Sequence, residues 1–124
     1  MLKETITYVD YNGTERTEDF YFNLDEAEIM ELEMSIDGGL VEMIQRIVSE
    51  QRAPEIIKIF KKLVLMAYGI KSLDGKRFEK SEEISTAFSQ TRAYSKLFMK
   101  LGTDAEYAVK FFKAIIPEPA QESK

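Results

Sequence analysis

Hydrophobic and polar positions alternate along residues 3–9, KETITYV, and again along residues 15–22, which end in three consecutive aromatic residues. Such alternation, with Thr, Ile, Val and Tyr prominent, is typical of β-strands. Asn12 and Gly13 lie between the two segments and tolerate the positive φ angles of tight hairpin turns. We therefore expect residues 1–23 to form a two-stranded hairpin with Phe20 and Phe22 on one face and Tyr21 on the other.

After residue 24 the apolar residues recur every three to four positions, which is the period of amphipathic helices. The clearest example is the segment GLVEMIQRIVSEQ, and the segment that starts at Pro54 also has apolar residues outside its main stripe. In the segment 82–90, Ile84, Ala87 and Phe88 are expected to point inward. The pattern predicts about six helices, over residues 26–34, 39–51, 54–69, 82–90, 92–101 and 104–116.

Helix-start and helix-stop residues divide these segments. Asp25 with Glu28 matches a capping box, and Leu24 with Ile29 matches the hydrophobic staple that accompanies it. Further caps are predicted at Ser81, at Thr91, and at Thr103 paired with Glu106. Glycines predict helix stops at 37–39, Gly69 and Gly102, and Asp74-Gly75 predicts a turn in a polar loop.

These elements predict an α+β fold that is mostly α: a two-stranded N-terminal β-hairpin followed by about six helices in a compact bundle. A chain of 124 residues has room for one domain with a real core. We expect a single domain over 1–117, made of the hairpin 1–23 and a helical body 24–117, with 118–124 as a flexible polar tail.

Composition removes several classes of function. The chain has no cysteine and no histidine, so thiolate metal sites and Ser-His-Asp or Cys-His catalysis are excluded. No apolar run reaches the roughly 18 residues of a membrane span, and the polar start MLKETITY lacks a signal-peptide core. We therefore expect a protein of the cytoplasm that does not contact a membrane.

Charge is divided unevenly along the chain, whose net charge is –5. Residues 1–37 hold 11 acidic and two basic residues, a net charge of –9, and residues 38–124 hold 11 acidic and 15 basic residues, a net charge of +4. This distribution disfavours nucleic acid as a partner, because backbone binding needs concentrated positive charge. The acidic part is either a solvated surface or a surface that steers a basic partner or another copy of the chain.

Few residues suggest chemistry. Glu28 and Glu31 share a helix face, where they form a solvated surface or, alternatively, bind a cation or act as acid and base. Arg92, Lys96 and Lys100 lie on the second helix of a segment that resembles a helix-turn-helix, a weak indication of DNA binding. No phosphate-binding loop is present. We expect no catalytic residue, no metal site and no cofactor.

The hairpin is the best candidate for a protein-interaction site. Its aromatic face either packs on the helical body or stays open for assembly, and an isolated two-stranded sheet has two unpaired edges that recruit other strands. A second copy of the chain or another subunit would be the partner. The candidate interaction residues are Tyr8, Tyr11, Phe20, Tyr21 and Phe22.

The segments TITYVDYNGTERTEDFYFNL, GGLVEMIQRIV, IIKIFKKLVLMAYGIKSLDGKRFEKS, FSQTRAYSKLFMKL and TDAEYAVKFFKAIIP occur in order over about residues 2–117. In these segments the chain resembles the tail assembly chaperones of long-tailed phages and prophages of Gram-positive bacteria. The resemblance implies a non-catalytic protein of the host cytoplasm, absent or minor in the mature virion. It implies that the protein binds the tape measure protein and keeps it soluble. It also implies recruitment of the tail tube protein and possible self-association. The alternative is a structural tail or head–tail connector subunit that stays in the virion.

Overall fold

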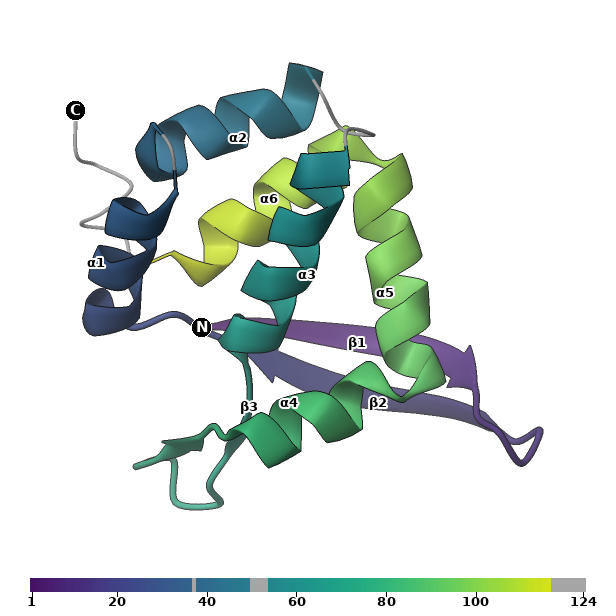
Figure 1. Cartoon of the computed structure of the whole chain (residues 1–124). Coiled ribbons are helices and arrows are strands. Elements are labelled where there is room, and N and C mark those ends of the chain that lie inside the picture. Colours follow the sequence, from purple (N-terminus) through teal and green to yellow (C-terminus); the bar gives the residue numbers. More distant parts are fainter. Residues whose placement is uncertain (37, 50–53, 117–124) are drawn as a thin grey trace.

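The computed structural model describes residues 1–36, 38–49 and 54–116. In this part of the chain, strand β1 (Leu2–Val9) pairs with β2 (Glu15–Phe22) in an antiparallel register that places Ile6 opposite Glu18. Gly13 in the connecting turn has φ +81°, as the Asn-Gly pair predicted. The N-terminal hairpin is therefore confirmed (Figure 1).

The expectation of only two strands is wrong. Strands β3 (Tyr68–Lys71) and β4 (Phe78–Glu79) extend the sheet in the order β1-β2-β3-β4, with Tyr21 opposite Gly69. Gly69, expected as a helix stop, instead lies in β3. A Cβ atom at this position would lie 2.7 Å from a ring carbon of Phe78, so glycine is needed here for close approach between strands.

Six helices in the described residues match the predicted number. Their bounds are Glu26–Ser35 for α1, Gly39–Ser49 for α2, Pro54–Ala67 for α3, Glu82–Ser89 for α4, Arg92–Thr103 for α5 and Ala105–Ile115 for α6. A compact bundle is not confirmed, because the helices build the core together with the sheet. The domain bounds stay a prediction, and the predicted tail 118–124 lies outside the described residues.

Local capping rules hold at three of the four predicted helix starts. Asp25 accepts the N–H of Glu28 at 2.9 Å while Glu28 accepts the N–H of Asp25 at 3.0 Å, which completes the capping box. Ser81 and Thr91 cap α4 and α5 through their hydroxyl oxygens.

The fourth start is wrong: Thr103 is the last residue of α5, and Asp104 caps α6 by accepting the N–H of Tyr107 at 3.0 Å. The hydroxyl of Thr103 donates instead to the carbonyl of Met99. Gly102 does not stop α5, which continues through it.

At the predicted stop 37–39, α1 has already ended at Ser35, Gly38 has φ +82°, and Gly39 begins α2. Residue 37 lies outside the described residues. The turn at Asp74-Gly75 is present, but it joins β3 to β4. Ala87 is exposed and does not point inward, whereas Phe88 is buried.

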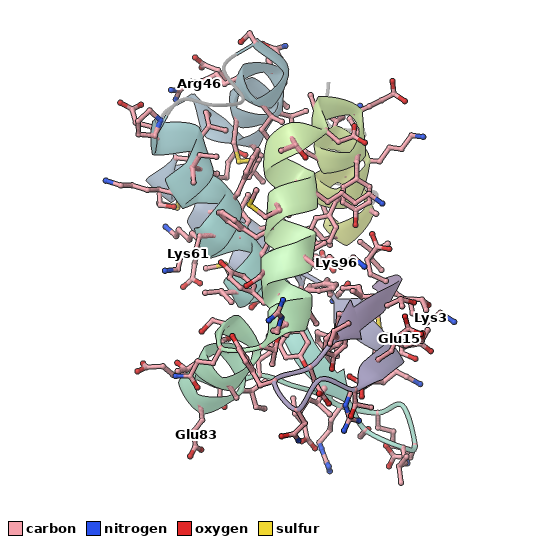
Figure 2. The ribbon with its side chains drawn as sticks, turned by 90° about the vertical axis from the view of Figure 1, so that its right-hand side faces the viewer. Lys3, Glu15, Arg46, Lys61, Glu83 and Lys96 are labelled. Carbon is pink, nitrogen blue, oxygen red and sulfur yellow. The ribbon has the colours of Figure 1, made fainter. Side chains whose placement is uncertain are left out.

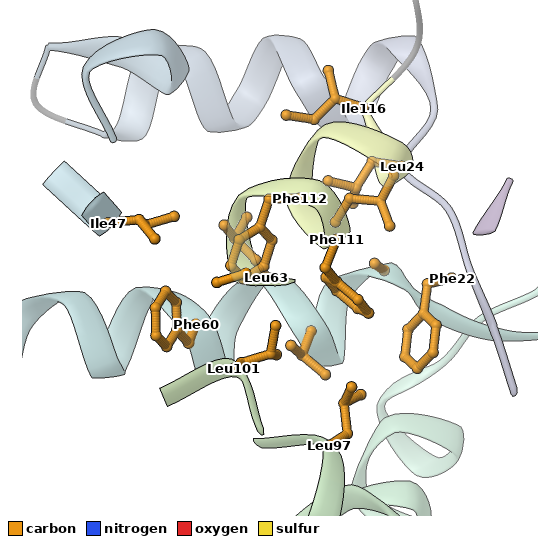
Figure 3. Close-up of a cluster of buried hydrophobic side chains, with 14 of the residues drawn as sticks. Phe22, Leu24, Ile47, Phe60, Leu63, Leu97, Leu101, Phe111, Phe112 and Ile116 are labelled. Carbon is orange, nitrogen blue, oxygen red and sulfur yellow. The ribbon is translucent and has the colours of Figure 1, made fainter. Parts of the chain in front are cut away.

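The hydrophobic core lies between the inner face of the hairpin and the helices. Phe22, Phe60, Phe111 and Phe112 are fully buried in it, and Phe60 stacks on Phe112 with ring centres 5.4 Å apart (Figure 3). None of the buried residues in the described part is polar or charged. The core therefore rests on apolar packing, with burial of each large side chain worth about 1.5–3 kcal/mol.

Candidate protein-interaction surface

The inner face of the hairpin is occupied by the helical body. Phe22 is fully buried and its ring centre lies 5.2 Å from that of Phe111 and 5.9 Å from that of Phe88. Phe20 is half-buried, 5.5 Å from Phe88. These edge and tilted arrangements add to the energy of burial. Phe22 thus contributes to the core of the folded chain.

Tyr8 lies at the outer end of the same face. It is half-buried, its ring contacts Phe20, and its hydroxyl donates to a carboxylate oxygen of Glu18 at 2.5 Å. This hydrogen bond, together with partial burial, raises the pKa of the Tyr8 hydroxyl. The side chain is therefore held as a neutral donor that ties the two strands together.

Tyr21 and Tyr11 are turned away from the core. Tyr21 is half-buried on the outer face, with the ammonium of Lys71 5.7 Å from its ring centre. Tyr11, in the hairpin turn, keeps 76% of its surface exposed, and the guanidinium of Arg92 lies 5.6 Å from its ring centre. Of the five candidate aromatic residues, Tyr11 is the most accessible.

A network centred on Asp10 shapes the hairpin turn. Its carboxylate accepts the backbone N–H groups of Asn12 at 2.8 Å and Thr14 at 3.0 Å, and it accepts the side chain of Arg16 at 2.5 Å. The hydrogen bond from Arg16, strengthened by those from the backbone, keeps the pKa of the Asp10 carboxyl below its ordinary value. The turn is therefore ordered by an ionised side chain.

The two edges of the hairpin are used differently. At the free edge of β1, the ammonium of Lys96 from α5 donates to the carbonyl oxygen of Thr7. Figure 2 shows Lys96 on α5 next to the hairpin. At the edge of β2, pairing with β3 covers only Tyr21 and Phe22 in the described residues, so 15–20 have no strand partner on that side. The expectation of two unpaired edges is therefore wrong for β2, which pairs with β3 at Tyr21 and Phe22. It holds for β1, which lies at the edge of the described sheet.

A groove of about 490 Å³ lies where β1 meets α5. We call it the β1–α5 groove; its lining includes Thr7, Val9, Glu15, Arg92, Lys96 and Met99. Val9 and Met99 are exposed by 45% and 63%, so its floor is partly apolar. Its lining contains two basic residues of α5, Arg92 and Lys96, and one acidic residue, Glu15.

Glu28 is used by the fold. Both of its carboxylate oxygens accept from the ammonium of Lys80, at 2.8 and 2.9 Å, and this ammonium also donates to the carbonyl oxygen of Asn23 at 2.6 Å. We call this arrangement the Lys80 clamp. Because it engages Glu28, the pairing of Glu28 with Glu31 as a cation or acid–base site has no support in the geometry.

Two further kinds of feature are absent from the described residues. None of their carboxylates gather in groups of three or more that could hold a metal ion. No helix among 1–36, 38–49 and 54–116 is both long and apolar enough to cross a membrane. The remaining functional features are surfaces: the outer side of the hairpin, the β1–α5 groove and exposed apolar side chains.

Comparison with protein families gives a match over the full length: the family model described as phage tail assembly chaperone matches residues 1–124. The chain belongs to this family. No curated protein and no solved structure gives a significant match. The function of the chaperone in tail assembly therefore rests on the family, and its surfaces must be interpreted from its own residues.

Sequence reasoning named three basic residues of α5 in this chaperone but missed the groove. Each is engaged within the chain: Arg92 with Tyr11, Lys96 with Thr7, and Lys100 over the ring of Tyr107, 4.1 Å from its centre. The partner of Lys96 is 89 residues away in sequence. The four-residue spacing shows that these bases share a face, and it contains no information on what that face meets.

Proposed function

We propose that this tail assembly chaperone is a non-catalytic protein that binds the tape measure protein, keeps it soluble and recruits tail tube subunits during tail morphogenesis. The observation that carries the proposal is the family match over residues 1–124. It acts in the cytoplasm of the host and is absent from, or minor in, the mature virion.

The exposed apolar side chains support binding to a long helical partner. Four methionines are more than half exposed, namely Met1, Met30, Met34 and Met99, and Leu73 is fully exposed. Methionine repacks easily against varied surfaces, which suits a partner that presents many similar helical segments. Tyr11, exposed in the hairpin turn, is the candidate aromatic residue best placed for contact.

Co-expression tests the proposal. The tape measure protein is expressed alone and with the chaperone, and its soluble fraction and the co-purified complex are measured. We expect a higher soluble fraction and a complex that survives purification. Equal solubility in both cultures, with no co-purification, would refute the proposal.

Two further measurements define the role. Tyr11→Ala is compared with Ala87→Ser, a change at another exposed position, and only the former is expected to weaken the complex. Mass spectrometry of purified virions separates the chaperone from the alternative, a structural tail or connector subunit. Stoichiometric copies in the virion would support a structural subunit and contradict the proposal that the chaperone is absent from, or minor in, the mature virion.

A further inference from the structure

Strand β2 leaves part of its second edge unpaired. Its first edge pairs with β1 along the whole strand, whereas β3 pairs with β2 only at Tyr21 and Phe22 and then turns to β4. In Figure 1, β3 meets β2 near the end of that strand, and the rest of β2 runs from the hairpin turn. We call residues 15–19 on the β3 side the open β2 edge.

Backbone hydrogen bonds fix which groups point to this edge. The N–H of Asn23 donates to the carbonyl oxygen of Ala67 on the β3 side at 2.8 Å, and the N–H of Asp10 donates to the carbonyl oxygen of Thr14 across the hairpin at 2.9 Å. Because such positions alternate in antiparallel pairs, both bonds direct the odd-numbered residues of β2 to the β3 side. The residues whose N–H and C=O groups point to the open β2 edge are therefore Glu15, Thr17 and Asp19.

The open β2 edge is free to accept a strand. Among the described residues, none donates to or accepts from the backbone groups of residues 15, 17 and 19 on this side. Proteins commonly block such edges with lysine, proline or a bulge. Residues 15–20 contain no lysine and no proline, their register with β1 is unbroken, and Arg16 is held by Asp10 at 2.5 Å. The usual blocking devices are thus missing here.

The side chains of this edge select the charge of an added strand. Glu15 and Asp19 are exposed on the outer face of the hairpin, four positions apart, with Thr17 between them. Antiparallel pairing of two copies about Thr17 would place Glu15 of one opposite Asp19 of the other, and like charges directly opposite each other are destabilising. A strand with basic residues at alternate positions instead places a base opposite each acid.

We propose that the open β2 edge binds an extended segment of another protein that carries lysine or arginine at alternate positions. The segment extends the sheet where β3 has turned away, with its basic side chains on the outer face beside Glu15 and Asp19. Main-chain hydrogen bonds supply affinity, and the charges set the register. This inference goes beyond the proposed function, which assigns no partner to a strand edge.

Amide hydrogen exchange of the chaperone alone, followed by NMR, tests whether the edge is open. The N–H groups of Arg16 and Glu18 face β1 and should exchange slowly, while those of Thr17 and Asp19 should exchange at least about tenfold faster. Slow exchange at Thr17 and Asp19 would mean that the edge is already covered, by a second copy if protection rises with protein concentration. Either result would overturn the proposal.

Binding is tested with a synthetic eight-residue peptide of alternating lysine and threonine, titrated into the isotope-labelled chaperone. We expect the amide signals of Thr17 and Asp19 to shift and their exchange to slow. Because the charges are exposed, the dissociation constant should weaken at least about tenfold from low to high salt. No shift of these signals at about 1 mM peptide in low salt would overturn the proposal.

Methylation of the peptide nitrogens separates strand pairing from simple charge attraction. In the bound register, the lysine N–H groups of the peptide face β2 and its threonine N–H groups face solvent. Methylation of the lysine N–H groups is expected to weaken binding at least about tenfold, and methylation of the threonine N–H groups much less. The two methylated peptides have the same charge and composition, so equal affinities would overturn the proposal.

A charge reversal on the chaperone tests the pairing of side chains. Glu15→Lys with Asp19→Lys is expected to bind the lysine peptide at least about tenfold more weakly, and to bind a peptide of alternating glutamate and threonine. The matched control, Glu82→Lys with Glu83→Lys on α4, makes the same change at exposed positions; Figure 2 shows Glu15 on the hairpin and Glu83 away from it. An equal loss in the control would show that net charge explains the binding, and would overturn the proposal.

A single variant keeps the test decisive if the double change disturbs the hairpin, because Asp19 also accepts the hydroxyl of Thr5 at 2.6 Å. Glu15→Lys leaves that hydrogen bond in place. It is expected to weaken binding of the lysine peptide at least about threefold. Native affinity in this variant, with circular dichroism unchanged, would overturn the proposal.

Discussion

Three consecutive aromatic residues in β2 provide an internal comparison of core and surface. Phe22 is fully buried, with its ring centre 5.2 Å from Phe111, 5.7 Å from Tyr68 and 5.9 Å from Phe88. Phe22→Ala removes all three contacts and leaves a cavity. A change of this kind costs about 3–5 kcal/mol, out of a total stability of roughly 5–15 kcal/mol.

The neighbouring Tyr21 is the matched control because it points to the opposite face. The ammonium of Lys71 lies over the ring of Tyr21, in a cation–π interaction worth about 0.5–1 kcal/mol at an exposed site. We expect Tyr21→Ala to cost about 1 kcal/mol or less. Phe20→Ala should fall between the two, since Phe20 is half-buried beside Phe88.

The assay is thermal and urea unfolding followed by circular dichroism. At about 3–4 °C for each kcal/mol in a chain of this size, Phe22→Ala should lower the melting temperature by about 10–20 °C. Tyr21→Ala should lower it by about 4 °C or less. Equal midpoints for the two variants would refute the inward and outward assignment of the hairpin faces.

Other positions give sharp contrasts. Lys80→Met breaks the Lys80 clamp and should cost about 1–3 kcal/mol in urea unfolding, whereas Arg77→Met, in an exposed ion pair, should change stability by about 0.5 kcal/mol or less. Gly69→Ala should destabilise the chain because its Cβ would clash in the sheet. Gly102 lies in a helix with the nearest atom 4.0 Å from an added Cβ, so Gly102→Ala should stabilise the chain by up to about 1 kcal/mol. Melting temperatures that fall for both variants would contradict this. The folded-state pKa of Asp10 is lowered, so its contribution to stability is present above the unfolded-state pKa and is lost as pH falls through the folded-state value. An NMR titration that gives this carboxyl an ordinary pKa would contradict the turn network.

The sequence predicted those features that depend on neighbouring residues. The hairpin turn at Gly13 and the caps at Asp25, Ser81 and Thr91 need only side chains within three or four positions, so local patterns sufficed. The predicted cap of α6 was wrong because Thr103 and Asp104 are adjacent and both residue types suit an N-cap. The hydroxyl of Thr103 is used inside α5, which leaves the carboxylate of Asp104 as the cap.

Long-range pairing is what the sequence could not reveal. Strand β3 is only four residues long and exists because it pairs with β2, some 48 positions earlier at Tyr21 and Gly69. Gly69 comes soon after a helix, where a helix-stop glycine is expected. A glycine that allows two strands to approach closely occurs in the same local sequence pattern, so the sequence does not distinguish the two roles. For the same reason the candidate aromatic residues were found, but the β1–α5 groove beside them was not.

The bonds that close the hairpin against the C-terminal helices join distant positions. Thr7 binds Lys96 across 89 positions, Glu4 accepts from Tyr107 across 103, and the N–H of Leu24 donates to the carbonyl of Ile115 at 3.1 Å. During synthesis at about 5–20 residues per second, Phe22 is made roughly 4–18 seconds before Phe111, its partner in α6. The hairpin can form early, but its aromatic side gains its full cover only when α6 emerges from the ribosome. Completion of this core therefore requires the C-terminal helix, and until α6 is made the aromatic side of the hairpin lacks part of its apolar cover.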